Sequence, residues 1–315
     1  MPQLTQGQLL EELEPTVAKN LDRHLSVAKE WMPHDYVPWD EGRNFAALGG
    51  EDWSPEQSRM SKVAQTALEV NLLTEDNLPS YHREIDNRFG RDGAWGTWVH
   101  QWTAEEGRHA IVIRDYLVVT RAVDPMELER GRISTMQQGY DSGGKGVLDS
   151  IAYVSFQELA TRISHRNTGT FTGEPLAEKL LARVAADENL HMIFYRDLLR
   201  AAFEVDPDQA MAAVTKEVVN FEMPGSNITG FTRKAAAIAK AGIYDLRIHH
   251  DEVVAPILRH WGVWEMTGLG PEGEQSRQRL AEHMEQLDRQ ASRFVEQRAA
   301  AAAKLAERQA AGAAV

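Results

Sequence analysis

The motif Glu-x-x-His occurs twice in this chain, as Glu106/His109 within WTAEEGRHA and as Glu188/His191 within AADENLHMI. Residues three apart on an α-helix lie on the same face, so each pair can direct a carboxylate oxygen and an imidazole nitrogen at one point. A chain of this size contains about one such pair by chance, and a single pair would be read as a surface pair. The residues around the two pairs therefore decide their meaning.

Those surroundings are apolar at helical spacing. The positions that share a helix face with the two glutamates are Val99, Trp102, Ala110 and Ile113 around Glu106, and Leu181, Val184 and Met192 around Glu188. An ionised carboxylate in a protein core is strongly unfavourable unless it is paired or binds a metal. The pattern therefore predicts core carboxylates with a cationic partner.

Two single glutamates on apolar faces complete the pattern. Glu75 precedes Glu106 by 31 residues, and Glu158 precedes Glu188 by 30. A helical hairpin repeated twice would direct two glutamates and two Glu-x-x-His pairs into a four-helix bundle, which is the arrangement of di-iron and di-manganese carboxylate sites. Four glutamates are neutralised by two divalent ions, and oxygen-rich ligands with one imidazole per ion favour iron or manganese over zinc.

The rest of the chain fits an all-α protein. Apolar residues recur every three or four positions in stretches such as MSKVAQTALEVNLLTEDNL, while period-two alternation is scarce. We expect a single domain over residues 1–315, with an irregular and helical N-terminal wrap over 1–57. The Ala-rich end, about 286–315, is expected to be a helix or tail that frays toward Val315.

Charge and composition exclude several classes of function. The net charge is -13, which argues against nucleic-acid binding and against docking on anionic lipid. The chain has no cysteine, so disulfides, thiolate nucleophiles and Cys-ligated metals are excluded. No stretch approaches the roughly 20 apolar residues of a membrane helix, and the N-terminus lacks a signal-peptide pattern. A cytoplasmic location is expected.

Several stretches resemble the soluble acyl-[acyl carrier protein] desaturases, both the plant stearoyl type and the actinobacterial and mycobacterial branch. They are TEDNLPSY, WTAEEGRH, SFQELATRISHRNTG, AADENLHMIFYRDL and WMPHDYVPW. The resemblance implies a ferritin-like four-helix bundle with additional flanking helices, usually a homodimer. It also implies an enzyme that uses O2, two iron ions per chain and electrons from a ferredoxin. Such an enzyme introduces a cis double bond into a saturated fatty acyl chain carried on acyl carrier protein.

The same resemblance implies roles for individual residues. Glu75, Glu106 and His109 would hold one iron, and Glu158, Glu188 and His191 the other, with Glu106 and Glu188 bridging. Thr161 would lie on the oxygen side of the cluster, where its hydroxyl could relay a proton. Trp31 and Asp187 would form an electron-entry path to His109, with Asp187 orienting the imidazole. The alternatives are simple packing for Trp31, a solvated acid for Asp187 and core filling for Thr161.

Other positions carry weaker expectations. Trp102, Phe156 and Met192 are either walls of an acyl tunnel or ordinary core residues, and His165 could lie behind a ligand. His249 and His250 are expected at a solvated helix edge. Acyl carrier protein is acidic, so its docking needs a local positive patch, for which Arg233, Lys234 and Lys240 are candidates. The alternative for these three residues is a solvated helix face.

Three other functions remain open at this stage. The ribonucleotide reductase small subunit shares the bundle and stores a radical on a tyrosine after the first motif; that position here is Ile113, although Tyr195 follows the second motif. An iron-storage or structural bundle is a second alternative, which the length and the Trp-rich N-terminal segment disfavour. A catalytically inactive paralogue that binds acyl carrier protein is the third.

Overall fold

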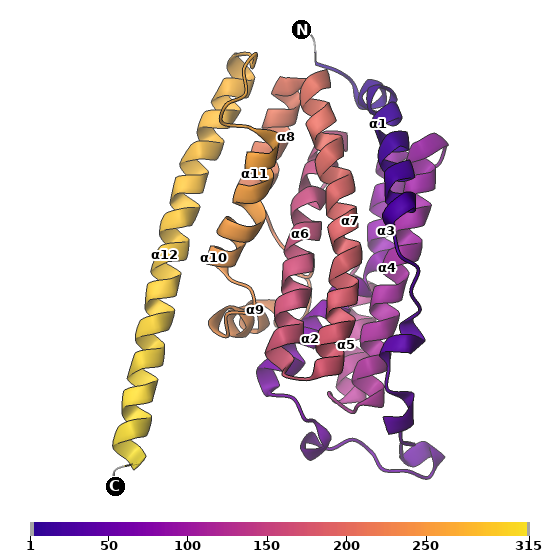
Figure 1. The fold of residues 1–315 in the computed structure, drawn as a ribbon, viewed down its shortest axis with the longest axis vertical. Coiled ribbons are helices and arrows are strands. Elements are labelled where there is room, and N and C mark those ends of the chain that lie inside the picture. Colours follow the sequence, from indigo (N-terminus) through magenta and orange to yellow (C-terminus); the bar gives the residue numbers. More distant parts are fainter. Residues whose placement is uncertain (1–2, 314–315) are drawn as a thin grey trace.

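A computed structural model describes residues 3–313, and no strand occurs among them (Figure 1). The α-helices are α1 Gln6–Val27, α2 Lys62–Glu75, α3 Leu78–Phe89, α4 Gly93–Val119, α5 Pro125–Gln138, α6 Val147–Thr172, α7 Pro175–Val205, α8 Pro207–Val219, α9 Phe231–Lys240, α10 Leu246–Ile248, α11 Ala255–Trp261 and α12 Pro271–Ala313. Short 3-10 turns η1 Pro33–Tyr36, η2 Trp39–Glu41, η3 Ala46–Leu48 and η4 Pro55–Gln57 lie between α1 and α2, and a π-helical segment η5 His249–Val254 precedes α11. The expectation of an all-α protein is confirmed.

Four helical rods enclose the centre of the molecule: α4, α6, α7 and the pair α2/α3. Helices α6 and α7 pack along their lengths as a hairpin, α2 packs on α6 and α4, and α1 lies against α7 and α4 (Figure 1). Sequence explains the hairpin, because Gly173 ends α6 in a left-handed conformation and Pro175 begins α7. The connection is thus only Gly173 and Glu174, which makes the two helices antiparallel.

The rod formed by α2 and α3 is interrupted at Glu75. Pro79 lies in the first turn of α3 and has no N–H to donate to the carbonyl of Glu75, four residues earlier. Helix α2 therefore ends at Glu75, and Asp76 and Asn77 form the turn before α3. A helix end thus lies inside the bundle, next to the other carboxylates.

The N-terminal segment is more regular than expected. Helix α1 is a 22-residue amphipathic helix that buries Leu9, Leu13, Val17, Leu21 and His24 against the bundle. Only the stretch from Ala28 to Ser61 is an irregular wrap with short turns. Apolar residues recur every three or four positions in the sequence of α1. This spacing is typical of a helix that buries one face, so α1 belongs to the core and not to the wrap.

The C-terminal end differs from expectation in its extent. Helix α12 begins at Pro271, not near residue 286, and runs along one side of the molecule (Figure 1). Leu280, Leu287 and Ala291 are buried, and Arg298 forms an ion pair with Asp245, so the helix packs on the rest of the molecule as far as Arg298. The described side chains of the alanine-rich run that follows are exposed. The fraying expected at Val315 lies outside the described residues.

The expectation of a solvated helix edge is wrong for His249, whereas His250 is partly exposed and pairs with the exposed Asp251. His249 is 9% exposed, stacks on Phe221 with ring centroids 4.7 Å apart, and has its Nδ1 2.9 Å from the Tyr244 hydroxyl. The π-helical turn at η5 directs this ring inward, and such a turn is not recognisable from periodicity. Among the described residues no helix is long and apolar enough to cross a membrane.

Candidate metal centre

All six predicted ligands lie together at the centre of the bundle. Glu75 comes from the last turn of α2, Glu106 and His109 from α4, Glu158 from α6, and Glu188 and His191 from α7, and every one of these side chains is buried. They form two four-residue groups whose potential ligand atoms lie within 4.8 Å of one another: Glu75, Glu106, His109 and Glu188, and Glu106, Glu158, Glu188 and His191. Glu106 and Glu188 belong to both groups, so each could contribute an oxygen to two ions.

The imidazoles direct their Nδ1 atoms into the cluster. His109 Nδ1 lies 3.1 Å from Glu106 Oε2, 3.4 Å from Glu188 Oε1 and 3.5 Å from Glu75 Oε2. His191 Nδ1 lies 2.9 Å from Glu106 Oε1 and 3.7 Å from Glu158 Oε2. Both rings therefore present the same nitrogen to the same group of carboxylate oxygens.

Several of these atoms have no hydrogen bond within the protein, although they are buried. They are Glu106 Oε1, Glu158 Oε2, both oxygens of Glu188 and His191 Nδ1. His191 Nδ1 and Glu106 Oε1 are close enough for a hydrogen bond, but the angles at the two atoms do not suit one. Buried polar groups without partners are rare and indicate that something is bound there. Lone pairs of oxygen and nitrogen that converge on one region fit a pair of divalent cations.

The charges of the cluster support the same conclusion. Burial, together with the charges of Glu106 and Glu158, raises the pKa of Glu188 well above its usual range. Burial acts to lower the pKa of His109, but the surrounding carboxylates of Glu106, Asp187 and Glu188 together outweigh it and raise the pKa well above 6.5. A bound cation would offset the mutual repulsion of these buried carboxylates.

Asp187 and Trp31 are joined to His109 as expected. Asp187 Oδ2 lies 3.4 Å from His109 Nε2 and accepts a hydrogen bond of 2.7 Å from the Trp31 indole. Arg183 and Arg108 also pair with this carboxylate, and both guanidinium groups lie over the Trp31 ring. The structure places Trp31, Asp187 and His109 in one continuous chain of contacts, whereas a solvated position for Asp187 is excluded by its burial.

A second carboxylate, Glu105, was missed by the sequence reasoning. Its Oε2 lies 2.8 Å from His191 Nε2, and His24 from α1 lies on its other side. Glu105 directly precedes Glu106, and adjacent residues on a helix point about 100° apart, so a face-based search for ligands passes over it. His24 carried a detectable signal, because it continues the buried face of α1.

Thr161 and His165 lie on the side of the cluster next to Glu75. The Thr161 hydroxyl donates to the carbonyl of Gln157 at 2.9 Å, and His165 Nε2 lies 2.8 Å from Glu75 Oε1. Both side chains are buried and both border a cavity. His165 thus lies behind Glu75, while a role of Thr161 in proton transfer stays a prediction.

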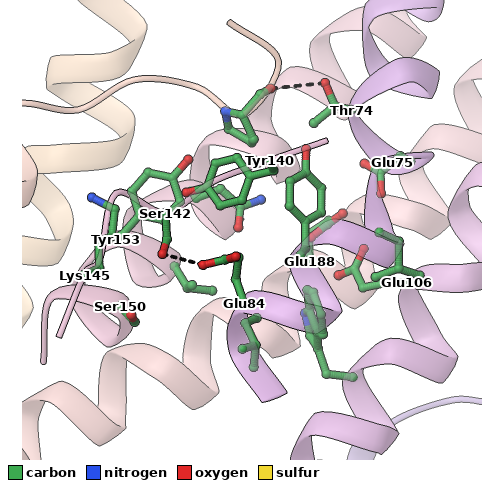
Figure 2. Close-up of a pocket in the computed structure, with 17 residues that line it drawn as sticks. Thr74, Glu75, Glu84, Glu106, Tyr140, Ser142, Lys145, Ser150, Tyr153 and Glu188 are labelled. Carbon is green, nitrogen blue, oxygen red and sulfur yellow. Dashed lines mark hydrogen bonds between the residues drawn. The ribbon is translucent and has the colours of Figure 1, made fainter. Parts of the chain in front are cut away.

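A cavity of about 750 Å³, including its opening to solvent, leads to the carboxylates. Figure 2 shows Lys145 and Ser150 toward one end and Glu75, Glu106 and Glu188 at the other. The side chains between the two ends are mostly apolar or aromatic: Leu78, Tyr81, Ile85, Trp102, Tyr140, Tyr153 and Val154. Of the three residues that could be tunnel walls or ordinary core, Trp102 lines this cavity, but Phe156 and Met192 line neither this cavity nor the one next to it.

A second cavity of about 580 Å³ adjoins the first at Thr74, Glu75 and Pro224. The Thr74 hydroxyl lies 3.3 Å from the Pro224 carbonyl between the two cavities (Figure 2). Val70, Met223, Phe231, Ala235 and Ile238 make its wall apolar, so helix α9 covers one side of it. Apolar space therefore extends from the carboxylate and histidine cluster in two directions.

Comparison with known proteins identifies the family. A family model described as fatty acid desaturase matches residues 5–311. The chain belongs to the fatty acid desaturase family. This desaturase-family chain is 54% identical to DesA1 of Mycobacterium tuberculosis, provisionally described as an acyl-[acyl-carrier-protein] desaturase, over 92% of this chain and 88% of that protein. It is 30% identical to the palmitoyl-[acyl-carrier-protein] 4-desaturase 2 of Ophrys sphegodes, over 85% of this chain and 76% of that one.

A solved structure supports the fold of this desaturase-family chain. The X-ray structure of DesA2 of Mycobacterium tuberculosis, also provisionally described as an acyl-ACP desaturase, superimposes with a TM-score of 0.70 at 32% identity. The match covers 85% of this chain and 99% of DesA2. The expected ferritin-like, all-helical fold is thereby confirmed.

Proposed function

We propose that this chain is an O2-dependent acyl-[acyl carrier protein] desaturase that introduces a cis double bond into a saturated fatty acyl chain. The observation that carries the proposal is the mainly apolar cavity that ends at Glu75, Glu106 and Glu188. A cavity of this kind accommodates a hydrocarbon and brings a methylene group to the cluster, whereas an iron-storage or structural bundle has no need of one. The names of the relatives, which describe desaturation of acyl chains on acyl carrier protein, agree with it.

The six clustered residues would hold two iron ions, and Glu106 and Glu188 belong to both groups of possible ligands. An unactivated methylene C–H bond is beyond the reach of any side-chain base, and iron with O2 supplies the oxidising power when bound. Overall, one acyl chain, one O2, two electrons and two protons give an alkene and two waters.

The protein's own residues position the acyl chain and keep water away from it. Trp102 lines the cavity and donates its indole N–H to Glu158 at 3.2 Å, so one side chain connects the substrate wall with a ligand. Leu78, Ile85 and Val154 exclude water from the reacting methylene group. Asp187 holds His109 through its Nε2, and two partly buried guanidinium groups lie over the Trp31 indole. A ferredoxin-type donor would deliver electrons at this place.

Carrier docking is proposed beside α9. Arg233 and Lys240 are exposed on α9, whereas Lys234 is partly buried in an ion pair with Glu69. The opposite face of α9 lines the second cavity through Phe231, Ala235 and Ile238. A positive surface next to an apolar opening is suited to an acidic carrier that presents an acyl chain. The active unit is expected to be a homodimer of single-domain chains.

Metal content and turnover test the proposal together. The purified chain is reconstituted with ferrous iron and supplied with a ferredoxin system, O2 and palmitoyl- or stearoyl-acyl carrier protein, and products are located by mass spectrometry. We expect about two irons per chain and a monounsaturated product. Two irons with no product on a series of chain lengths would favour the inactive paralogue. A folded protein that binds no iron would contradict the metal centre itself.

A further inference from the structure

Glu105 approaches His191 from the side opposite the metal cluster. His191 Nδ1 faces Glu106 Oε1, whereas its Nε2 lies 2.8 Å from Glu105 Oε2. Both side chains are buried, Glu105 at 5% exposure and His191 at 0%. A neutral imidazole has one N–H and one lone pair, so an N–H directed at Glu105 leaves the lone pair of Nδ1 directed at the cluster.

Glu105 is itself held in place by two other side chains. His24 Nε2 lies 3.1 and 3.0 Å from its two oxygens, and Gln101 Nε2 donates to Oε1 at 2.6 Å. His24 is 1% exposed and meets the Trp98 ring edge to face at 5.1 Å, so its ring cannot turn without repacking. The contacts join α1, α4 and α7 in one buried network.

The carboxylates that contact the two histidine rings, Asp187 and Glu105, differ in their surroundings. Asp187, behind His109, contacts two partly exposed guanidinium groups and a buried indole. The partners of Glu105 are two imidazoles and an amide, all directed into the bundle. The two histidine ligands are therefore supported by chemically different carboxylates, and a change in one should act on one metal position only.

We propose that Glu105, fixed by His24 and Gln101, is a positioning residue that sets the orientation and tautomer of His191 and so controls the affinity of one of the two metal positions. The inference rests on the metal centre of the proposed function, but not on desaturation. Carboxylates that orient a ligand imidazole through its other nitrogen typically contribute a factor of about 10 to 100 in metal affinity.

Cobalt(II) binding to the metal-free protein provides the test, with calorimetry and cobalt electron paramagnetic resonance as readouts. The unmodified chain should bind two cobalt ions. Glu105→Ala should weaken one of them by about tenfold to 100-fold and leave the other within about twofold. Glu105→Gln keeps an acceptor oxygen and should recover most of the affinity, while His24→Leu should weaken the same ion to a smaller degree.

Two further variants separate positioning from a general structural role. Glu217→Gln is the matched control, because Glu217 is also a buried, ion-paired glutamate but its partner is Lys145; cobalt binding should not change. In a His191→Ala background, Glu105→Ala should weaken cobalt binding no further, since its target is gone. Helicity and melting temperature of each metal-free variant verify that it is folded.

Equal weakening of both ions by Glu105→Ala, or an undiminished effect in the His191→Ala background, would overturn the inference. Unchanged affinity for both ions in Glu105→Ala would also overturn it. The desaturase proposal is judged separately by product formation, so a chain that makes no alkene but shows the one-ion pattern would retain the inference and lose the proposed function.

Discussion

At the scale of single residues, Glu188 shows how a ligand opposes stability when no metal is bound. Neither of its oxygens has a hydrogen bond, and its pKa is raised by burial and by Glu106 and Glu158. Glu188→Gln keeps the size of the side chain and replaces the titratable carboxyl by a neutral amide. We expect the metal-free protein to keep or raise its melting temperature, and the rise on adding cobalt(II) or anaerobic ferrous iron to shrink markedly. Thermal unfolding with and without metal measures both. A variant that loses stability without metal but keeps the full metal-dependent rise would contradict this assignment.

The cavity wall gives a second prediction for one residue. Val154 is buried and lines the cavity between α3 and α6. Val154→Phe should place a ring in the acyl path and lower kcat/KM for stearoyl-acyl carrier protein by about tenfold or more, with iron content unchanged. Steady-state kinetics and iron analysis on the same sample test this. Val27→Phe on the exposed end of α1 is the control for the same substitution, and equal losses in both variants would argue against the path.

At the scale of secondary-structure elements, helix α9 connects a charged surface with the second cavity. Reversal of two exposed charges, Arg233→Glu with Lys240→Glu, should raise the KM for acyl carrier substrates several-fold at low salt and have less effect at high salt. Lys234 should contribute less, because Glu69 already pairs with it. Arg289→Glu on α12 is the control for an exposed charge elsewhere. An unchanged KM in the α9 double variant at low salt would support the alternative of a solvated helix face.

At the scale of the whole molecule, His249 links stability to pH where η5 packs on the loop that follows α8. Burial, with smaller effects of His250 and His283, lowers the pKa of His249 to about 4. Between about pH 4 and 6.5 the unfolded chain binds the proton and the folded chain does not. The free energy of unfolding should therefore rise with pH in this window, by at most about 3 kcal/mol from this group.

Urea unfolding at several pH values measures the effect of His249. His249→Gln should flatten the pH dependence by up to about one proton between pH 4 and 6.5, relative to the unmodified chain. The same substitution should leave metal content unchanged, because His249 contacts Phe221 and Tyr244 rather than the cluster. An identical slope for both chains would show that other groups dominate the acid sensitivity.

The sequence by itself determined the helical class and the six candidate ligands that the structure brings together. Side chains three residues apart on a helix must share a face, and the recurrence of Glu-x-x-His with a single glutamate about thirty residues earlier specifies a repeated hairpin. The end of α2 at Glu75 was also predictable from sequence, because Pro79 has no N–H to donate to the Glu75 carbonyl. These are local properties, fixed by periodicity and by missing hydrogen-bond donors.

Only the tertiary structure decided what lies behind each ligand and where the apolar space leads. Glu105 meets His191 and His24 across 86 and 81 residues of sequence, and Trp31 meets Asp187 across 156. The inward turn of His249 and the absence of Phe156 and Met192 from both cavity walls depend equally on how helices are rotated about their axes. Helix rotation and neighbour choice follow from the packing of the whole core, which no single stretch of sequence specifies.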